Sequence, residues 1–400
     1  MTRRRLTTML GLAIAIGLAV STAQSGAVAK ATCNDSNPVL IGTLYSMSGP
    51  AAGIGKLAQQ GASMAVRDIN ASGGIVGRCV KEDLKDDTGS PTTAAQVIRE
   101  AIDQDHATFI IGPFLSSPTA VTLPVTTQAK VIQMNNSALL VPDWSLYPYA
   151  FKTETNSEQQ AQIFLPFLKA HNWTRVAVYA PNNAFGTVFV PTFTKYAAAQ
   201  GITVVKSALV VSGTPDVTPQ MTDLKNADPQ ALVWAVNADP DQIAALKARY
   251  ALGWDVPVLG TSALQNTSTT NNFTAAQLKT VYAYAYKTMT YTAQSPKPAD
   301  PLAQAFISGF AKWIHAHGIK ESISQAAGAY DSFILLAKAA NAVKSVDSDK
   351  IKQYFETHRM NGVRGHYIWT ATQHDGVAVD DFGMVSVKSL NAFGILKQVK

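Results

Sequence analysis

The residues best suited to chemistry in this sequence lie in three short polar turns, at residues 46–50, 112–119 and 135–139. Each turn follows an apolar run that predicts a buried strand. The turns carry hydroxyls, amides and glycines, and in open α/β sheets the turns at the carboxyl ends of the strands form the ligand site. The sequence therefore predicts a protein that binds a small polar ligand.

The turn at residues 112–119 is the most specific of the three. Ser116 and Ser117 stand where the following helix is expected to begin, so free backbone N–H groups and hydroxyls would point outward together. A helix N-terminus of this kind favours a carboxylate or another small anion. Ordinary N-capping of the helix by Ser117 is the alternative interpretation of the same residues.

Motifs typical of enzymes are missing from the sequence. No G-x-S-x-G, H-E-x-x-H or P-loop pattern occurs, and the 7 histidines are scattered. Gly53 and Gly55 follow the first expected strand as in a dinucleotide-binding loop, but Ala58 stands where the third glycine belongs. We therefore expect a protein that is not an enzyme and that uses no cofactor.

Two groups of acidic residues have structural interpretations. Asp83, Asp86 and Asp87 follow the second expected strand, and a solvated strand end explains them better than a metal site. Asp239 and Asp241 open an expected helix, where they are typical N-cap and first-turn residues. We expect no bound metal.

Strand and helix patterns alternate along the chain, and they form two successive series. Expected strands lie at 39–45, 79–84, 108–111 and 131–134, then at 175–179, 202–209, 231–235 and 257–259. This alternation predicts an α/β fold with two doubly wound parallel-sheet lobes. Three helices expected at 302–317, 324–343 and 348–357 would bury little surface alone, so we expect them to pack on the first lobe. A long strand at 280–288 and strands at 365–370 and 382–387 complete the pattern.

The composition is that of a folded protein without a nucleic-acid site. Apolar residues make up 47% and charged residues 15% of the 400 residues, which excludes a disordered chain. The net charge of +6 includes Arg3, Arg4 and Arg5, and without these three residues 30 positive charges stand against 27 negative ones. No basic stripe remains to neutralise phosphates.

The N-terminus has the pattern of a secretory signal peptide over residues 1–29. Three arginines precede an apolar run at residues 9–20, and small residues lead to a cleavage site after Ala29, with Ala31 as the near alternative. The apolar run is too short to span a hydrocarbon core of roughly 30 Å. We expect export to the periplasm or another extracytoplasmic space. There the oxidising environment favours a disulfide between Cys33 and Cys79, if their strands are neighbours.

Several motifs in the same order resemble one family, the leucine/isoleucine/valine-binding proteins. These are periplasmic solute-binding components of ABC transporters with a type I periplasmic-binding fold, and the resemblance extends over nearly the whole mature chain. It rests on residues 41–44, 48–50, 61–62, 65–66, 68–70, 73–75, 86–87, 94–95, 111–112, 116–119 and 179–186.

The resemblance implies two lobes joined by three crossing segments near residues 151–153, 286–288 and 370–373. Lobe 1 would contain residues 38–152 and 287–372, and lobe 2 residues 153–286 and 373–400. A monomer of this kind would close on a small solute and deliver it to the permease and ATPase subunits of an ABC importer. A ligand sensor of the same fold, of the amide or receptor type and acting through a partner protein, is the alternative.

The resemblance also implies a ligand site. Ser116 and the turn that contains Ser137 would hold a ligand carboxylate, and lobe 2 would supply further contacts. The complete set of ligand-binding residues expected on this basis is Ser48, Ile54, Leu115, Ser116, Ser117, Thr119, Asn136, Ser137, Leu139, Phe185, Asn237, Ala238 and Ser262.

Three positions depart from the family pattern. Amino-acid binders usually carry an acid in the turn that matches Ser262, where this chain offers hydroxyls only. Leu139 stands where a hydroxyl is common, and Ile54 where an aromatic residue is common. A buried ammonium group without a carboxylate partner is costly. Two ligand classes therefore remain open: a branched-chain amino acid-like solute, and an aromatic or short-chain acid.

Overall fold

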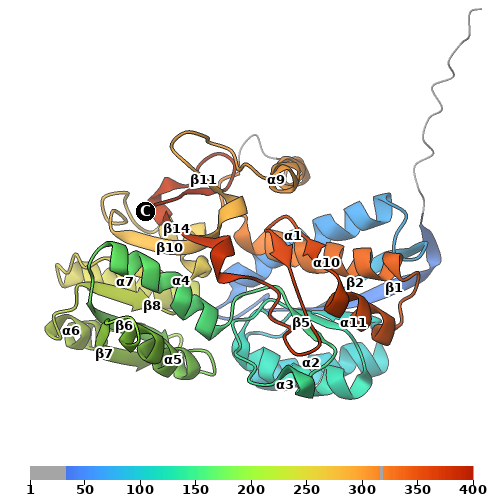
Figure 1. Cartoon of the computed structure of the whole chain (residues 1–400), viewed down its shortest axis with the longest axis horizontal. Helices are drawn as coiled ribbons and strands as arrows, with labels where there is room; N and C mark the ends of the chain where they lie inside the picture. Colours follow the sequence, from blue (N-terminus) through green and yellow to red (C-terminus); the bar gives the residue numbers. More distant parts are fainter. Residues whose placement is uncertain (1–32, 316–318, 400) are drawn as a thin grey trace, which may run out of the picture.

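The computed structural model describes residues 33–315 and 319–399, in two α/β lobes (Figure 1). The signal peptide expected at residues 1–29 lies outside the described residues. No helix in the described ranges is long and apolar enough to cross a membrane.

The first lobe is built on a five-stranded parallel sheet with the strand order β2-β1-β3-β4-β5. Its apolar strands are buried between helices, as a parallel sheet requires. The strands are β1 (Asn34–Tyr45), β2 (Arg78–Asp86), β3 (Phe109–Ile111), β4 (Gln133–Asn135) and β5 (Ala150–Lys152). Helices α1 (Ala52–Ala71), α2 (Pro91–Arg99, continued by a π-helical turn Glu100–Gln104) and α3 (Ser116–Ala129) connect them.

The second lobe is built on a six-stranded sheet with the order β14-β10-β9-β8-β6-β7, in which β14 is an antiparallel edge strand. Its strands are β6 (Arg175–Pro181), β7 (Thr203–Val210), β8 (Ala231–Trp234), β9 (Val258–Gly260), β10 (Val281–Tyr286) and β14 (Phe382–Ser386). Its helices are α4 (Ser157–Ala170), α5 (Gly186–Ala198), α6 (Thr218–Asn226), α7 (Asp239–Ala251) and α8 (Thr267–Thr270).

The helices of the last third complete the first lobe, as expected. These are α9 (Pro301–Trp313), α10 (Ser324–Ala342) and α11 (Ser348–Thr357). Helix α10 lies directly against α1, and a Cβ atom on Gly61 of α1 would be 1.9 Å from the carbonyl oxygen of Ala326. Close packing of the two helices therefore requires glycine at this position.

Short strands occupy much of the C-terminal region. They are β11 (Thr290–Tyr291), β12 (Met360–Asn361), β13 (His366–Tyr367) and β15 (Leu396–Lys397). The strand expected at residues 365–370 is shorter than predicted, because only His366 and Tyr367 pair, and their partner is β12. Similarly, the strand expected at 280–288 ends at Tyr286, and a 3-10 turn (Lys287–Met289) follows it.

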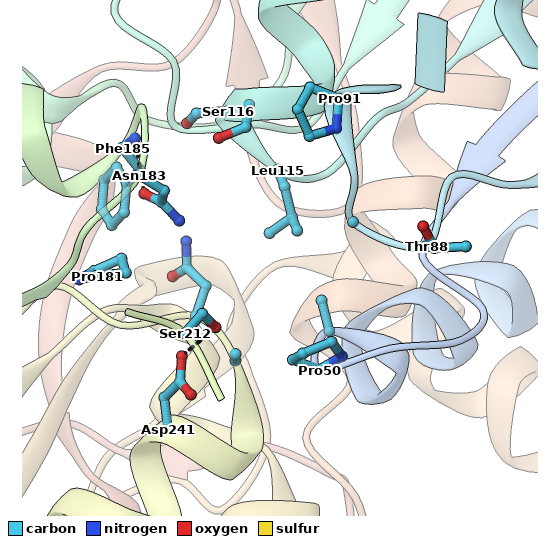
Figure 2. A pocket seen from close by; sticks show the side chains of 15 residues that line it. Pro50, Thr88, Pro91, Leu115, Ser116, Pro181, Asn183, Phe185, Ser212 and Asp241 are labelled. Atoms are coloured by element: carbon cyan, nitrogen blue, oxygen red, sulfur yellow. Dashed lines mark hydrogen bonds between the residues drawn. The ribbon is translucent and has the colours of Figure 1, made fainter. Parts of the chain in front are cut away.

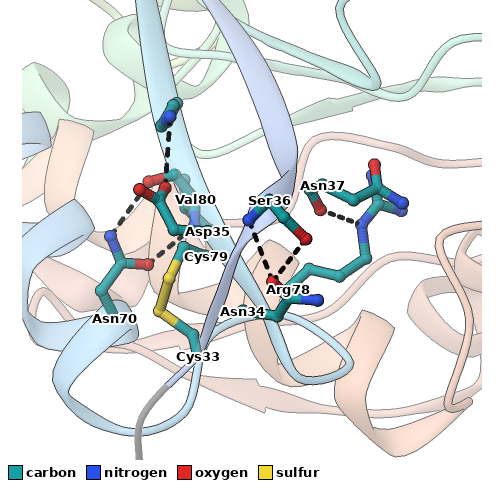
Figure 3. Close-up of a disulfide and its surroundings, with 10 residues drawn as sticks. Cys33, Asn34, Asp35, Ser36, Asn37, Asn70, Arg78, Cys79 and Val80 are labelled. Carbon is teal, nitrogen blue, oxygen red and sulfur yellow. Dashed lines mark hydrogen bonds and ion pairs between the residues drawn. A yellow bond between two sulfur atoms is a disulfide. The ribbon is translucent and has the colours of Figure 1, made fainter.

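Strands β1 and β2 are neighbours, and a disulfide joins Cys33 to Cys79 at their start (Figure 3). The two Cα atoms are 4.9 Å apart. Asn70, at the end of α1, exchanges two hydrogen bonds with the backbone of Val80 on β2. This corner of the first lobe is thus held by a covalent bond and by hydrogen bonds.

We propose that the lobes meet at the three crossing segments near residues 151–153, 286–288 and 370–373. Two buried ion pairs lie among these segments. Lys152 Nζ is 2.7 Å from Asp375 Oδ1, and Arg364 Nη1 is 3.0 Å from Glu154 Oε2. Tyr286 places its ring under the Arg364 guanidinium at 4.3 Å. Charged groups with little contact with solvent therefore join residues in and around these proposed segments.

Candidate functional site

A cleft between the two lobes contains a cavity of about 370 Å³, a volume suited to a small molecule. Turns after the carboxyl ends of β1, β2, β3, β6, β7 and β8 form its walls, where open parallel sheets place their ligands. The lining residues are Pro50, Ala51, Thr88, Gly89, Pro91, Leu115, Ser116 and Ser117 of lobe 1, and Pro181, Asn183, Phe185, Ser212, Asn237, Ala238 and Asp241 of lobe 2 (Figure 2).

The N-terminus of α3 forms one wall of the cleft. Leu115 is the N-cap residue, and no side chain caps this helix, so the interpretation of Ser117 as an N-cap was wrong. Ser116 is only 4% exposed, and its Oγ has no hydrogen-bond partner among the described residues. A buried hydroxyl without a partner costs free energy, and a ligand atom in the cleft would satisfy it.

Asp86 and Asp87 organise the lobe 1 side of the cleft. Asp86 Oδ1 accepts hydrogen bonds from the backbone N–H groups of Met47 (2.9 Å) and Thr88 (2.8 Å). Asp87 Oδ1 accepts from Ser46 Oγ (2.6 Å) and from Gly89 N (2.8 Å). The expectation of a solvated strand end was wrong here, because Asp87 is fully buried and ties two turns together.

The two carboxyl groups differ in their proton affinity. Burial raises the pKa of Asp87, although the Ser46 hydroxyl and the Gly89 N–H oppose this effect. Burial also acts to raise the pKa of Asp86, but hydrogen bonds from Ser48, Thr88 and Met47 outweigh it and lower that pKa. Asp86 therefore remains a charged acceptor that fixes the backbone of the turn at residues 46–50.

Asp241 brings a carboxylate to the opposite wall. It lies in the first turn of α7, where Ser212 Oγ donates to its Oδ2 and Gly213 N donates to its Oδ1 at 2.7 Å. Figure 2 shows Asp241 beside Ser212, with Ser116 on the far side of the cavity. Asp241 was expected in a first helical turn and lies there, but its position on the cleft wall was not predicted.

Asn183 and Phe185 come from the turn between β6 and α5, and Phe185 is the N-cap residue of α5. Asn183 Oδ1 accepts from the N–H groups of Phe185 (3.0 Å) and Gly186 (3.2 Å), which fixes the first turn of the helix. Neither Asn183 nor Ser212 was predicted as a site residue. Both follow parallel strands, β6 and β7, so the rule that selected the lobe 1 turns would have selected them too.

Of the residues expected in the ligand site, the cleft brings six together: Leu115, Ser116, Ser117, Phe185, Asn237 and Ala238. The others lie outside its wall. Ser48 is exposed, Ile54 belongs to the hydrophobic core, and Thr119 Oγ1 donates to Leu115 O within α3. Ser262 is buried at the start of a 3-10 turn (Ser262–Gln265).

The turn at residues 135–139 uses its side chains for internal contacts. Ser137 Oγ donates to Asn135 Oδ1 (3.3 Å), and Asn136 Nδ2 donates to Ser332 Oγ (3.2 Å). Leu139 is partly buried against a small apolar cluster of lobe 1. The backbone of this turn contacts the Ser116 turn, because Asn136 N donates to Pro113 O at 3.3 Å.

The described part of the chain contains no cluster of three or more His, Cys, Asp or Glu side chains that could hold a metal ion. The polar groups of the cleft are hydroxyls, amides, one carboxylate and the backbone N–H groups of a helix N-terminus. Such groups bind and orient a solute. The described residues that line the cavity include no histidine, cysteine or lysine that could act as a catalytic base or nucleophile.

Comparison with known proteins identifies the class. Residues 38–392 match the family model for periplasmic binding proteins, so the chain belongs to this family. It is similar to the Leu/Ile/Val-binding protein BraC3 of Rhizobium johnstonii, with 26% identity over 306 residues that cover 74% of this chain and 81% of the relative. It is also similar to an amino acid binding protein of Pseudomonas aeruginosa, with 38% identity over 94 residues, 24% of this chain and 25% of the relative.

Solved structures show the same fold. The branched-chain amino acid substrate-binding protein LivJ of Streptococcus pneumoniae, in complex with isoleucine, has a TM-score of 0.76 and 24% identity, covering 91% of this chain and all of that one. A solute-binding protein of Rhodopseudomonas palustris in complex with 3,4-dihydroxybenzoic acid has a TM-score of 0.76 and 20% identity. The match covers 89% of this chain and 94% of that one.

The expected family, fold and absence of enzymatic activity are thus confirmed: this is a type I periplasmic binding protein of the leucine/isoleucine/valine-binding family. The family is extracytoplasmic, and its members bind small solutes without transforming them.

Proposed function

We propose that this protein captures a small carboxylate-bearing solute by lobe closure and delivers it to the permease of an ABC importer. The observation that carries the proposal is the buried, unpartnered Ser116 hydroxyl at the uncapped start of α3. Together with the first backbone N–H groups of the helix, it forms a site for a carboxylate. The turn at residues 135–139 lies outside the cavity wall and supports this site through the hydrogen bond from Asn136 N to Pro113 O.

We further propose that the solute carries an ammonium group. The turn at Ser262 offers no acid, but Asp241 on the opposite wall supplies a carboxylate from another element. A cleft with a helix N-terminus on one wall and a carboxylate on the other is complementary to the two charges of an amino acid. This arrangement supports an amino acid over an acid that lacks the ammonium group.

The test is a comparison of ligands on the purified, ligand-stripped mature protein. Isoleucine, leucine and valine should raise the melting temperature, because a ligand that binds only the folded state stabilises it. Benzoate and 3,4-dihydroxybenzoate should give smaller shifts. Stabilisation by the aromatic acids alone would contradict the amino-acid assignment and retain the carboxylate site.

Import is distinguished from sensing in intact cells. Deletion of the gene should abolish uptake of the radiolabelled solute that binds best in vitro. Normal uptake combined with a lost transcriptional response to that solute would instead support the sensor.

A further inference from the structure

The first turns of α1 and α7 approach each other from opposite lobes. A Cβ atom on Gly53 of α1 would lie 2.0 Å from Oδ2 of Asp239 and 3.4 Å from Oγ of Ser268. Gly53 has no positive φ, so its backbone conformation does not require glycine. The absence of a side chain at this position therefore matters for the contact between the lobes.

Asp239 is held firmly on lobe 2. Its Oδ2 accepts a hydrogen bond from Ser268 Oγ (2.6 Å), and its Oδ1 accepts from Thr269 Oγ1 (3.1 Å) and from Asn266 Nδ2 (3.2 Å). The residue is 8% exposed. Because three donors fix this short side chain, it cannot swing away from an obstacle on lobe 1 without losing hydrogen bonds.

Helix α1 lacks a negative charge of its own at this end. Its N-cap residue is Ala51, no side chain caps it, and its first turn contains no acidic residue. The N-terminus of a helix carries a partial positive charge that a nearby carboxylate stabilises. Asp239 brings such a carboxylate to this end of α1 from the other lobe.

We propose that Asp239 and Gly53 form a latch that stabilises the closed arrangement of the lobes and thereby strengthens ligand binding. The latch rests on the proposed capture of a solute by lobe closure. Asp239 supplies a negative charge to the N-terminus of α1, and it does so only while the two lobes are closed. Gly53 is a positioning residue, because any side chain there holds the two helices apart without touching the ligand.

The latch is tested with Gly53→Ala and Asp239→Asn, and with Gly383→Ala as the matched control. A Cβ on Gly383 would meet no atom closer than 3.5 Å, so this change introduces no collision. Calorimetry uses isoleucine and benzoate as probes. Both test variants should bind the better probe at least tenfold more weakly than the parent, whereas the control should bind it equally well.

The melting temperature of ligand-free protein separates the latch from a folding defect. Alanine is a better helix former than glycine, so Gly53→Ala should leave the melting temperature of the ligand-free protein unchanged or raise it. A variant that melts earlier and binds more weakly in proportion would indicate a structural role and contradict the latch.

Closure itself is measured as the distance between two spin labels in the double variant Lys56→Cys and Lys247→Cys. Lys56 lies on α1 and Lys247 on α7, and both side chains are exposed. The parent should populate a short distance that Gly53→Ala loses. Equal distance distributions and equal affinities would overturn the latch, and so would a parent that never shows the short distance. If the parent binds neither probe, the proposed ligand class fails, and the distances in ligand-free protein still decide the latch.

Discussion

Ser116 Oγ is buried on the cleft wall at the start of α3, and no described residue hydrogen bonds to it. Replacement by alanine removes the hydroxyl and leaves the helix backbone in place. A hydrogen bond to a charged ligand group contributes roughly 1.5–3 kcal/mol, so Ser116→Ala should weaken ligand binding by about tenfold or more. Calorimetry with the best ligand measures this change, and unchanged affinity would contradict the carboxylate assignment. Ser36→Ala, at an exposed position near the start of β1 and so at the opposite end of that strand from the cleft, is the control.

Asp241 makes a prediction that depends on the ligand. Asp241→Asn should weaken isoleucine binding by about tenfold or more, because the amide lacks the negative charge that an ammonium group requires. The same change should leave the affinity for benzoate unchanged or increase it, because the carboxylate of benzoate then no longer meets a second negative charge in the cleft. Calorimetry with both compounds checks the two directions together. Equal losses for both ligands would indicate that Asp241 acts only by holding the Ser212 turn.

Arg364 connects several elements near the proposed crossings. It pairs with Glu154, approaches Asp331 Oδ2 at 4.0 Å, lies over the Tyr286 ring and is 2% exposed. Arg364→Met should lower the free energy of unfolding by about 3–5 kcal/mol, because it leaves buried carboxylates without their partner. Urea denaturation measures this loss. The double variant with Glu154→Gln should recover part of it, and no recovery would contradict a charge-pairing role.

At the scale of the whole molecule, His374 makes stability depend on pH. Burial lowers the pKa of His374, and this effect outweighs the hydrogen bond to Ala150 O (2.7 Å) and the nearby Glu356 carboxylate. The unfolded chain therefore binds a proton at His374 at a higher pH than the folded chain does. The contribution of the neutral, buried His374 to the free energy of unfolding should be complete above about pH 6.5, the usual pKa of histidine. It should be lost as the pH falls from there to the lower pKa of His374 in the folded state.

The measurement is the melting temperature at pH 7.5 and at pH 5.5. His374→Asn keeps a donor for Ala150 O and removes the titrating ring, so this variant should lose less stability between the two pH values than the parent does. An equal loss in both proteins would show that other groups control the acid sensitivity.

Local patterns in the sequence were sufficient for most elements of the fold. The helix expected at residues 348–357 is α11 with the same bounds, and the alternation of strands and helices correctly predicted two α/β lobes. These features depend on residues close together in the chain, through apolar periodicity, helix capping and glycine stops. Parallel sheets also direct the turns after their strands to one edge, so the sequence predicted that polar turns gather at the edge where the cavity lies.

The tertiary structure decided which side chains of those turns face the cleft. Ser116 does, whereas Asn136 Nδ2 donates to the Ser332 side chain of α10 and Ser137 Oγ donates to the Asn135 side chain. Ser332 lies far from this turn in the chain, so no local pattern reveals that partner. Asp239 and Asp241 lie two positions apart on α7, and residues at this spacing point to different sides of a helix. Asp239 therefore contacts lobe 1, and Asp241 lines the cleft. The sequence determined the family and the fold, and only the packing of two lobes assigned each polar group its partner.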